Sequence, residues 1–205
     1  MKNNQSGRSM VEMLGVLAII GVLSAGGLAG YSKAMFKHKL NSTMDQITML
    51  VTNIRTMYGT QDSYAGLNEV KAVNLGIVPA IMVASHTPYK AAAGDDPEVA
   101  EAATLTNPFQ GGVSIAPADV NGANNGFSVT YGGLPKEACI ALATADFGSG
   151  AGSGFVGALI SGASKASGTY GTATEGNAYT MAANGNVPGA IDACSENTSI
   201  TWTFY

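Results

Sequence analysis

The first 60 residues divide into a stretch that is apolar on every side and a stretch that is apolar on one side only. Residues 13–31 are 19 consecutive positions without a charged side chain. A helix rises about 1.5 Å per residue, so this run covers most of the hydrocarbon core of a bilayer. Glu12 stands at its edge, and Arg8 precedes that carboxylate by one helical turn. The pattern predicts a membrane-spanning helix over about residues 13–32.

From residue 33 the apolar positions recur at steps of three and four, which is typical of a helix with one buried face. No proline interrupts residues 8–59, and Gly59 is a natural end for a helix. We therefore expect one helix over residues 8–59, with an amphipathic second half over about 33–59. The apolar positions of that half are Phe36, Leu40, Met44, Ile47, Leu50 or Val51, Ile54, and Met57 or Tyr58.

Five glycines in the first half weaken this helix. Each costs about 1 kcal/mol relative to alanine, but small residues also let helices approach closely in a membrane. The sequence leaves two interpretations open, local melting of the helix near residues 26–30 or close packing against other helices. The five are Gly15, Gly21, Gly26, Gly27 and Gly30.

After residue 59 the chain consists of short apolar pieces separated by turns. Residues 60–108 look like a connecting loop. Residues 112–116 and 127–131 alternate as strands, and the turn-rich segment 121–126 predicts their hairpin connection. Further on, Pro135 opens a helical segment, and residues 200–205 predict a last strand. A long helix followed by a small antiparallel sheet is the α+β fold class, with a globular head over residues 60–205.

Composition and charge favour an exported chain whose head does not bind nucleic acid. Charged residues make up only 12% of the sequence, and there are 27 glycines. From Glu69 to Glu196 there are 4 lysines against 11 acids, a balance of −7, whereas Lys33 to Arg55 carries +3. Binding to nucleic acid needs clustered lysine and arginine, which the head lacks. We interpret the acidic excess as a solvated surface.

The sequence holds no arrangement that predicts catalysis, a cofactor or a metal. The segment GSGAGSG at 148–154 invites a phosphate-loop interpretation, but it follows a helix and has no Lys-Ser/Thr after it. A flexible loop is the better interpretation. His38 and His86, the only histidines, have no neighbouring ligand partners in sequence. We therefore expect no enzyme and no metal site.

The N-terminal pattern resembles the class III leader of the type IV prepilins. The leader would be residues 1–7 (MKNNQSG), which are short, basic and polar and end in Gly7. Arg8 would open the mature chain, and Glu12 stands at the expected spacing before the apolar helix. Arg8 departs from the family, whose mature chains usually begin with Phe, Met, Leu or Trp. The order of motifs in the head, with a Pro-x-x-x-Cys helix, a late cysteine and a terminal strand, resembles the type IVb pilins.

This resemblance implies a processing pathway and a set of partners. A prepilin peptidase would cleave between Gly7 and Arg8, and the new α-amine of Arg8 would be methylated. The chain would wait in the inner membrane with its head in the periplasm. Inner-membrane assembly machinery would then polymerise it with other pilin subunits into an extracellular fibre. Glu12 would neutralise positive charge at Arg8, either its own or that of a neighbouring subunit.

The resemblance also implies the pilin fold and the role of a structural subunit, most simply the major one. Adhesion, aggregation, DNA transfer and motility are the uses open to such a fibre. Two other functions remain open from the sequence. The chain could be a minor pilin or a type II secretion pseudopilin. It could also be a secreted soluble adhesin or binding module, cut near Ala25–Gly27 by an ordinary signal peptidase.

The chain has two cysteines, Cys139 and Cys194. In a reducing compartment they would be two separate buried thiols. An export signal favours a disulfide between them, because thiols are oxidised outside the cytoplasm. We expect this bond to tie the helix that follows Pro135 to the C-terminal segment.

Overall fold

The computed structural model describes residues 6–91, 99–120, 122–145, 147, 154–161, 191 and 193–205, and the side chains of residues 6–9 and 161 are outside this description. The chain forms two compact units, Met1–Lys39 and Leu40–Tyr205. Helix α1 extends from Ser6 to Tyr58 and contributes to both. This is the long helix that the apolar pattern predicts, and it ends one residue before Gly59.

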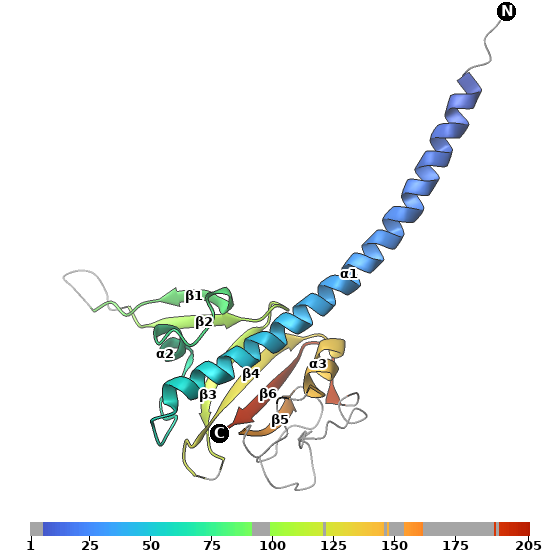
Figure 1. Cartoon of the computed structure of the whole chain (residues 1–205). Coiled ribbons are helices and arrows are strands. Elements are labelled where there is room, and N and C mark those ends of the chain that lie inside the picture. The colour runs from blue at the N-terminus through green and yellow to red at the C-terminus, as the bar shows by residue number, and fades with distance from the viewer. Residues whose placement is uncertain are drawn as a thin grey trace, which may run out of the picture. The chain divides into compact units, whose positions relative to one another are not determined.

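A six-stranded antiparallel sheet forms the centre of the second unit, with the order β1-β2-β3-β4-β6-β5 (Figure 1). The C-terminal strand β6 lies between β4 and β5, so it pairs with neighbours on both sides. The strands are β1 (Val83–Thr87), β2 (Ala102–Thr106), β3 (Gly112–Ala118), β4 (Gly126–Leu134), β5 (Phe155–Ser161) and β6 (Thr198–Phe204).

The hydrophobic core lies between α1 and one face of this sheet. Strands β4 and β6 place large apolar residues opposite each other, with Phe127 opposite Phe204 and Tyr131 opposite Ile200. Trp202 meets Tyr131 edge to face, with ring centroids 5.7 Å apart. From the helix, Ile47, Leu50 and Ile54 join the same buried cluster. Figure 1 shows the corresponding part of α1 lying along the sheet. The alternating pattern of residues 127–131 therefore correctly predicts the buried face of β4.

One expectation about the head needs correction. Residues 60–108, which look like a loop in the sequence, contain helix α2 (Glu69–Asn74), the one-turn 3-10 helix η1 (Ala80–Met82) and strands β1 and β2. Strand β1 alternates poorly, because four of its five residues are exposed. Strand β5 follows the glycine-rich segment 148–154 and was also missed. The flexible-loop interpretation of 148–153 falls outside the described residues.

The remaining elements agree more closely with the expectations from the sequence. Helix α3 (Lys136–Ala143) follows Pro135, and its first turn carries Glu137. Strands β3 and β4 form the expected hairpin, with Ala118 opposite Gly126. Strand β6 starts two residues earlier than expected, at Thr198.

A buried asparagine organises the turn between β2 and β3. Asn107 is only 3% exposed, and its Nδ2 donates to the carbonyl of Gly132 at 2.8 Å. Its Oδ1 accepts the backbone N–H groups of Phe109 at 2.9 Å and Gly111 at 3.1 Å. A Cβ on Gly111 would overlap the carbonyl oxygen of Gly132, so only glycine fits this close approach. The turn therefore depends on both the asparagine at position 107 and the glycine at position 111.

We expect Asn107→Ala to lower the free energy of unfolding by about 2–4 kcal/mol, because it leaves buried backbone groups without partners. Chemical denaturation of the purified chain measures this change. The matched control is Asn74→Ala, since the amide of Asn74 is exposed and its partner is the partly exposed carboxylate of Glu101. We expect the control to shift stability by less than about 1 kcal/mol. Equal losses in both variants would contradict the role assigned to Asn107.

Candidate assembly helix and the disulfide

The first part of α1 is apolar and exposed on all sides. Every described residue from Met10 to Met35 is exposed in the single chain, and Val22 reaches 75%. A helix that is hydrophobic all round is normally covered by lipid or by other protein. By length and composition alone, one helix among the described residues qualifies as able to cross a membrane, and it contains this segment. We call residues 10–35 the stem.

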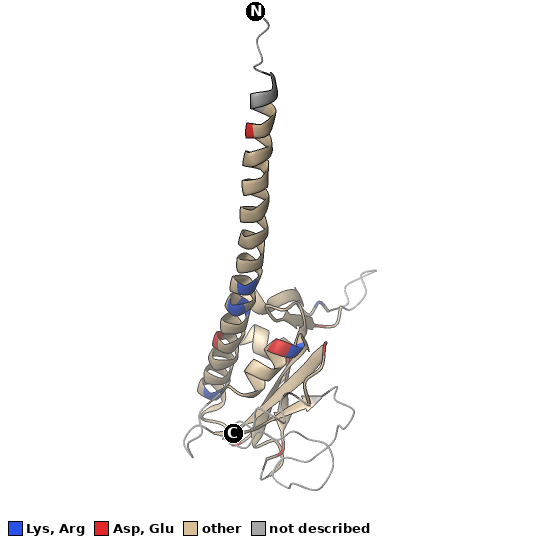
Figure 2. Cartoon of the chain, turned by 90° about the vertical axis from the view of Figure 1, so that its right-hand side faces the viewer, with Lys and Arg blue, Asp and Glu red and all other residues tan. Residues whose placement is uncertain are grey.

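Charge is absent from most of the stem. Figure 2 shows one acidic position near the start of the helix, then an uncharged length, then a group of basic positions. These positions correspond to Glu12 and to Lys33, Lys37 and Lys39. The five stem glycines all have open space around them, since a Cβ added to any of them would meet no atom within 4 Å other than the neighbouring backbone of the helix itself. Nothing within the single chain therefore requires glycine there, and the open space is available for close approach by another helix.

The sequence-predicted processing residues lie at the beginning of α1. Gly7 and Arg8 belong to its first turn, while Glu12 follows one turn later and is exposed. The side chain of Arg8 lies outside the described residues. Its pairing with Glu12 therefore stays a prediction.

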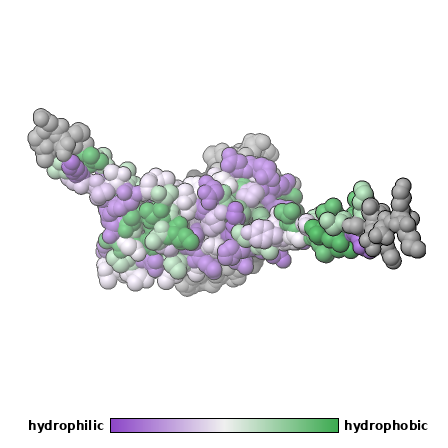
Figure 3. Space-filling model, turned by 90° about the horizontal axis from the view of Figure 1, so that it is seen from above, coloured by the Kyte–Doolittle hydropathy of each residue, from purple (hydrophilic) through white to green (hydrophobic). Residues whose placement is uncertain are grey.

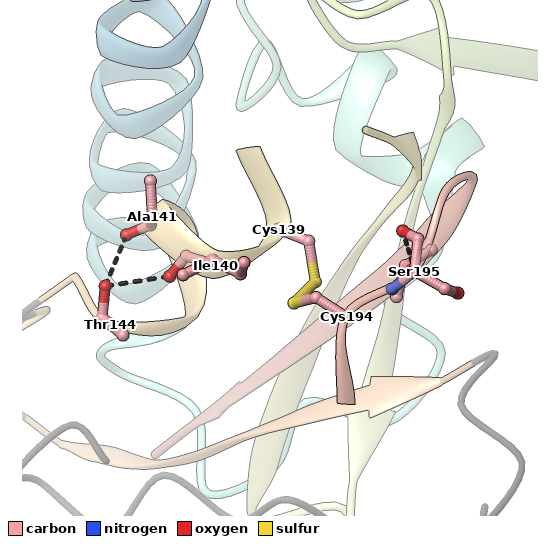
Figure 4. Close-up of a disulfide and its surroundings, with 7 residues drawn as sticks. Cys139, Ile140, Ala141, Thr144, Cys194 and Ser195 are labelled. Atoms are coloured by element: carbon pink, nitrogen blue, oxygen red, sulfur yellow. Dashed lines mark hydrogen bonds between the residues drawn. A yellow bond between two sulfur atoms is a disulfide. The ribbon is translucent and has the colours of Figure 1, made fainter. Parts of the chain in front are cut away.

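The expected disulfide is present between Cys139 on α3 and Cys194 (Figure 4). The two Cα atoms are 5.8 Å apart, although 55 positions separate the residues in sequence. Both cysteines are buried. Close to Cys194, the hydroxyl of Thr198 accepts the N–H of Ser195 at 2.9 Å. The bond thus holds α3 beside the segment that leads into β6.

The C-terminal end of α3 is also closed by a side chain. The Thr144 hydroxyl donates to the carbonyls of Ile140 at 2.9 Å and Ala141 at 3.2 Å (Figure 4). These carbonyls are in the last turn, where the helix itself offers few partners. Helix α3 is thereby fixed at its end as well as at Cys139.

Sequence reasoning missed a contact between the end of α1 and the C-terminal strand. The Nε of Arg55 donates to the carbonyl of Tyr205 at 3.0 Å, and its guanidinium lies 5.5 Å from the centroid of the Phe204 ring. Burial lowers the pKa of Arg55, and the nearby Tyr64 partly offsets this effect. The pKa of Tyr64 is raised, also mainly by burial. No local sequence signal could join residues 150 positions apart.

The titratable groups do not form a catalytic or metal-binding arrangement in the part of the chain that the structure describes. No group of three or more His, Cys, Asp or Glu residues is placed to hold a metal there. His86 lies 3.8 Å from the carboxylate of Glu101, a contact between two partly exposed side chains. Burial raises the pKa of the Tyr131 hydroxyl, which lies in the core between the sheet and α1. The surroundings of these groups are therefore those of structural residues rather than those of a reactive site.

Comparison with known proteins identifies the class. The family model called bundlin matches residues 33–205. Two curated relatives, from Escherichia coli O127:H6 and Escherichia coli O111:H-, are each a "major structural subunit of bundle-forming pilus". Each is 28% identical over 150 residues, which covers 73% of this chain and 69% of the relative.

Two solved structures share the fold. The type IV b pilin from Salmonella typhi has a TM-score of 0.50 and 22% identity, covering 79% of this chain and 97% of the other. The type IV pilin TcpA from Vibrio cholerae El Tor has a TM-score of 0.50 and 15% identity, with coverages of 82% and 99%. Together with the bundlin model and the two pilus-subunit relatives, this shared fold shows that the chain is a type IV pilin.

More particularly, the chain belongs to the bundlin family. It is a structural subunit of a pilus, and it assembles with other pilin subunits. This assignment favours a pilus subunit over the pseudopilin and the secreted adhesin that the sequence left open.

Proposed function

We propose that this pilin is the major subunit of a type IVb-like fibre and that its exposed stem is the part that drives assembly. The observation that carries the proposal is the stem itself, a helix segment that is uncharged from Met13 to Tyr31 and exposed in the single chain. Removing apolar surface from solvent contributes about 25 cal/mol per Å², so many bundled stems would stabilise a fibre strongly. The relatives named as major pilus subunits support the same role.

Before assembly, residues 13–32 hold the chain in the inner membrane with its head in the periplasm. A prepilin peptidase removes residues 1–7 by cutting between Gly7 and Arg8, and the new α-amine of Arg8 is methylated. Inner-membrane assembly machinery then transfers the subunit into the growing fibre. The spacing of Gly7, Arg8 and Glu12 before the apolar run supports this pathway. Among the possible uses, aggregation by contact between fibres is the one that the name of the bundle-forming relatives supports.

Glu12 has a specific part in this assembly. A carboxylate enclosed by apolar helices is costly without a partner, and the positive charge at the start of the mature chain is the nearest candidate. Pairing between Glu12 of one subunit and the Arg8 α-amine or guanidinium of its neighbour would fix their axial register.

The mass of the mature protein tests the processing pathway. We expect it to correspond to a chain that begins at Arg8 with one added methyl group. Gly7→Val should leave an uncleaved precursor, because a Cβ before the scissile bond obstructs a tight protease site. Gly15→Val is the matched control, since its Cβ would meet open space, and it should be cleaved normally. A mature N-terminus near Gly27 or Leu28 would overturn the pilin pathway, and normal cleavage of Gly7→Val would show that the site is misassigned.

A further inference from the structure

The head unit carries a group of exposed apolar side chains that lie outside the stem. Met49 and Met57 on α1 are 51% and 44% exposed. Leu75, which follows α2, is 47% exposed, and Ile81 on η1 is 79% exposed. Figure 3 shows hydrophobic side chains gathered on one face of the head and bordered by hydrophilic ones. Large exposed apolar groups that cluster in this way mark interaction sites.

A hydrogen bond joins the two segments of the chain that carry the members of this group. Asn53 lies midway between Met49 and Met57 on the same stripe of α1, because the three residues are four positions apart. Its Nδ2 donates to the carbonyl of Ile77 at 2.7 Å. Ile77 is buried in the core, so this bond places the backbone at Ile77, two residues after Leu75 and four before Ile81, beside this stripe of the helix.

The neighbouring stripe of α1 is polar in composition but presents methyl groups. The hydroxyl of Thr48 donates to the carbonyl of Met44 at 2.9 Å. The Thr52 and Thr56 hydroxyls donate in the same way, each at 2.8 Å, to the carbonyls of Thr48 and Thr52. With their hydroxyls bonded to the helix, these threonines can be covered at little cost in lost hydrogen bonds to water. The outer face of a soluble helix is ordinarily charged instead.

We propose that these side chains form a docking surface for a second copy of this chain. We call it the Met-Thr face, and its members are Thr48, Met49, Thr52, Thr56, Met57, Leu75 and Ile81. The inference rests on the proposed function, because a fibre of identical subunits needs contacts between two different surfaces of each copy. The stem is one such surface, and α1 continues from the stem into this face.

The chemistry of the face favours another copy over other partners. None of its seven members is charged, so the face itself offers no ionic partner to a nucleic acid, an anionic lipid surface or a charged protein. The exposed charges beside it are of opposite sign, Asp45 four positions before Met49 and Lys71 four positions before Leu75. Flexible methionines adapt to irregular apolar surfaces, which suits contact with a second head or stem. Because this contact would be repeated along the fibre and the stems would also hold the subunits together, each copy of the contact needs only a low affinity.

Ile81→Asp in the full-length chain tests the contact. The side chain is mostly outside the core, so we expect normal subunit levels and a normal disulfide but about tenfold fewer fibres, because a buried unpaired carboxylate is costly. The matched control is Tyr89→Asp, which changes a 58% exposed residue beyond β1 and should leave fibre yield unchanged. Wild-type fibre yield from Ile81→Asp would overturn the docking surface while leaving the proposed function intact.

A photo-crosslinking amino acid placed at position 81 identifies the occupant. In assembled fibres we expect a product with twice the subunit mass that contains only peptides of this chain, and much less of it from position 89. A crosslink to a different protein, or none at position 81, would overturn the inference. Failure of the unsubstituted chain to form fibres would overturn the proposed function and this docking surface with it.

Discussion

Fibres of the Glu12→Ala variant are expected to be at least about tenfold scarcer than wild-type fibres, with leader cleavage and membrane insertion unchanged. The reason is that the carboxylate is the only charged group between Met10 and Lys33, and its removal would leave the positive charge at Arg8 without a partner among apolar helices. Breaking a buried ion pair costs about 3–5 kcal/mol, whereas about 1.4 kcal/mol already changes an equilibrium tenfold. Fibre yield and the mass of the mature subunit, measured side by side, check both parts.

Two further substitutions make this test specific. Glu12→Asp keeps the charge on a shorter side chain, so it should recover part of the fibre yield. Val11→Ala changes an adjacent exposed residue of the stem without altering charge, and it should assemble nearly as well as the wild type. Abundant fibres from Glu12→Ala would instead mean that the carboxylate only reaches the membrane interface and has no role in register.

Replacing Cys139 and Cys194 together by serine is expected to lower the free energy of unfolding of the head by about 4 kcal/mol. The chain-entropy model gives this value for a crosslink that closes a loop of about 55 residues. Domains are stable by only about 5–15 kcal/mol in total, so the loss is a large fraction. At about 2–4 °C per kcal/mol for a domain of this size, the Tm should fall by roughly 8–16 °C. Thermal unfolding followed by near-ultraviolet circular dichroism measures it.

The double variant avoids a free thiol that could crosslink two copies. Wild-type protein treated with a reductant is the control, and it should unfold at nearly the temperature of the variant. The wild-type cysteines should also resist alkylation until they are reduced. Two alkylated cysteines in untreated protein recovered from fibres would contradict the disulfide, and an unchanged Tm would contradict its contribution to stability.

Where the sequence predicted the fold well, local periodicity alone specified the element. Residues 13–31 could only be an apolar helix, and the alternation of residues 127–131 places Val129 and Tyr131 on the buried face. Strands β1 and β2 gave no such signal. Among the five residues of β2 only Leu105 is buried, and β1 is held by pairing with β2 rather than by its own apolar face. Pairing partners distant in sequence decide such strands, and a local pattern does not reveal them.

The candidate sites also divide into those that the sequence could predict and those that it could not. The cysteine pair could be predicted because only two cysteines exist and the export signal favours oxidation. The contact of Arg55 with Tyr205 and the Met-Thr face could not, because each depends on how α1 lies on the sheet. Thr48, Thr52 and Thr56 look like an ordinary solvated stripe in the sequence. Only their hydrogen bonds to the preceding carbonyls show that they can be covered.

The position of β6 sets the order in which the head can be completed during synthesis. This strand is made after every other strand described here, yet it occupies an interior place, between β4 and β5. Until residues 198–204 emerge, β4 has an open edge and β5 has no neighbour on this side. Contacts between such distant segments form slowly, and open edges are prone to aggregation. Nascent heads therefore pass through a period in which they are prone to aggregation, and this period ends only with the insertion of β6. Cys194 lies four positions before this strand, so it becomes available for oxidation at nearly the same moment.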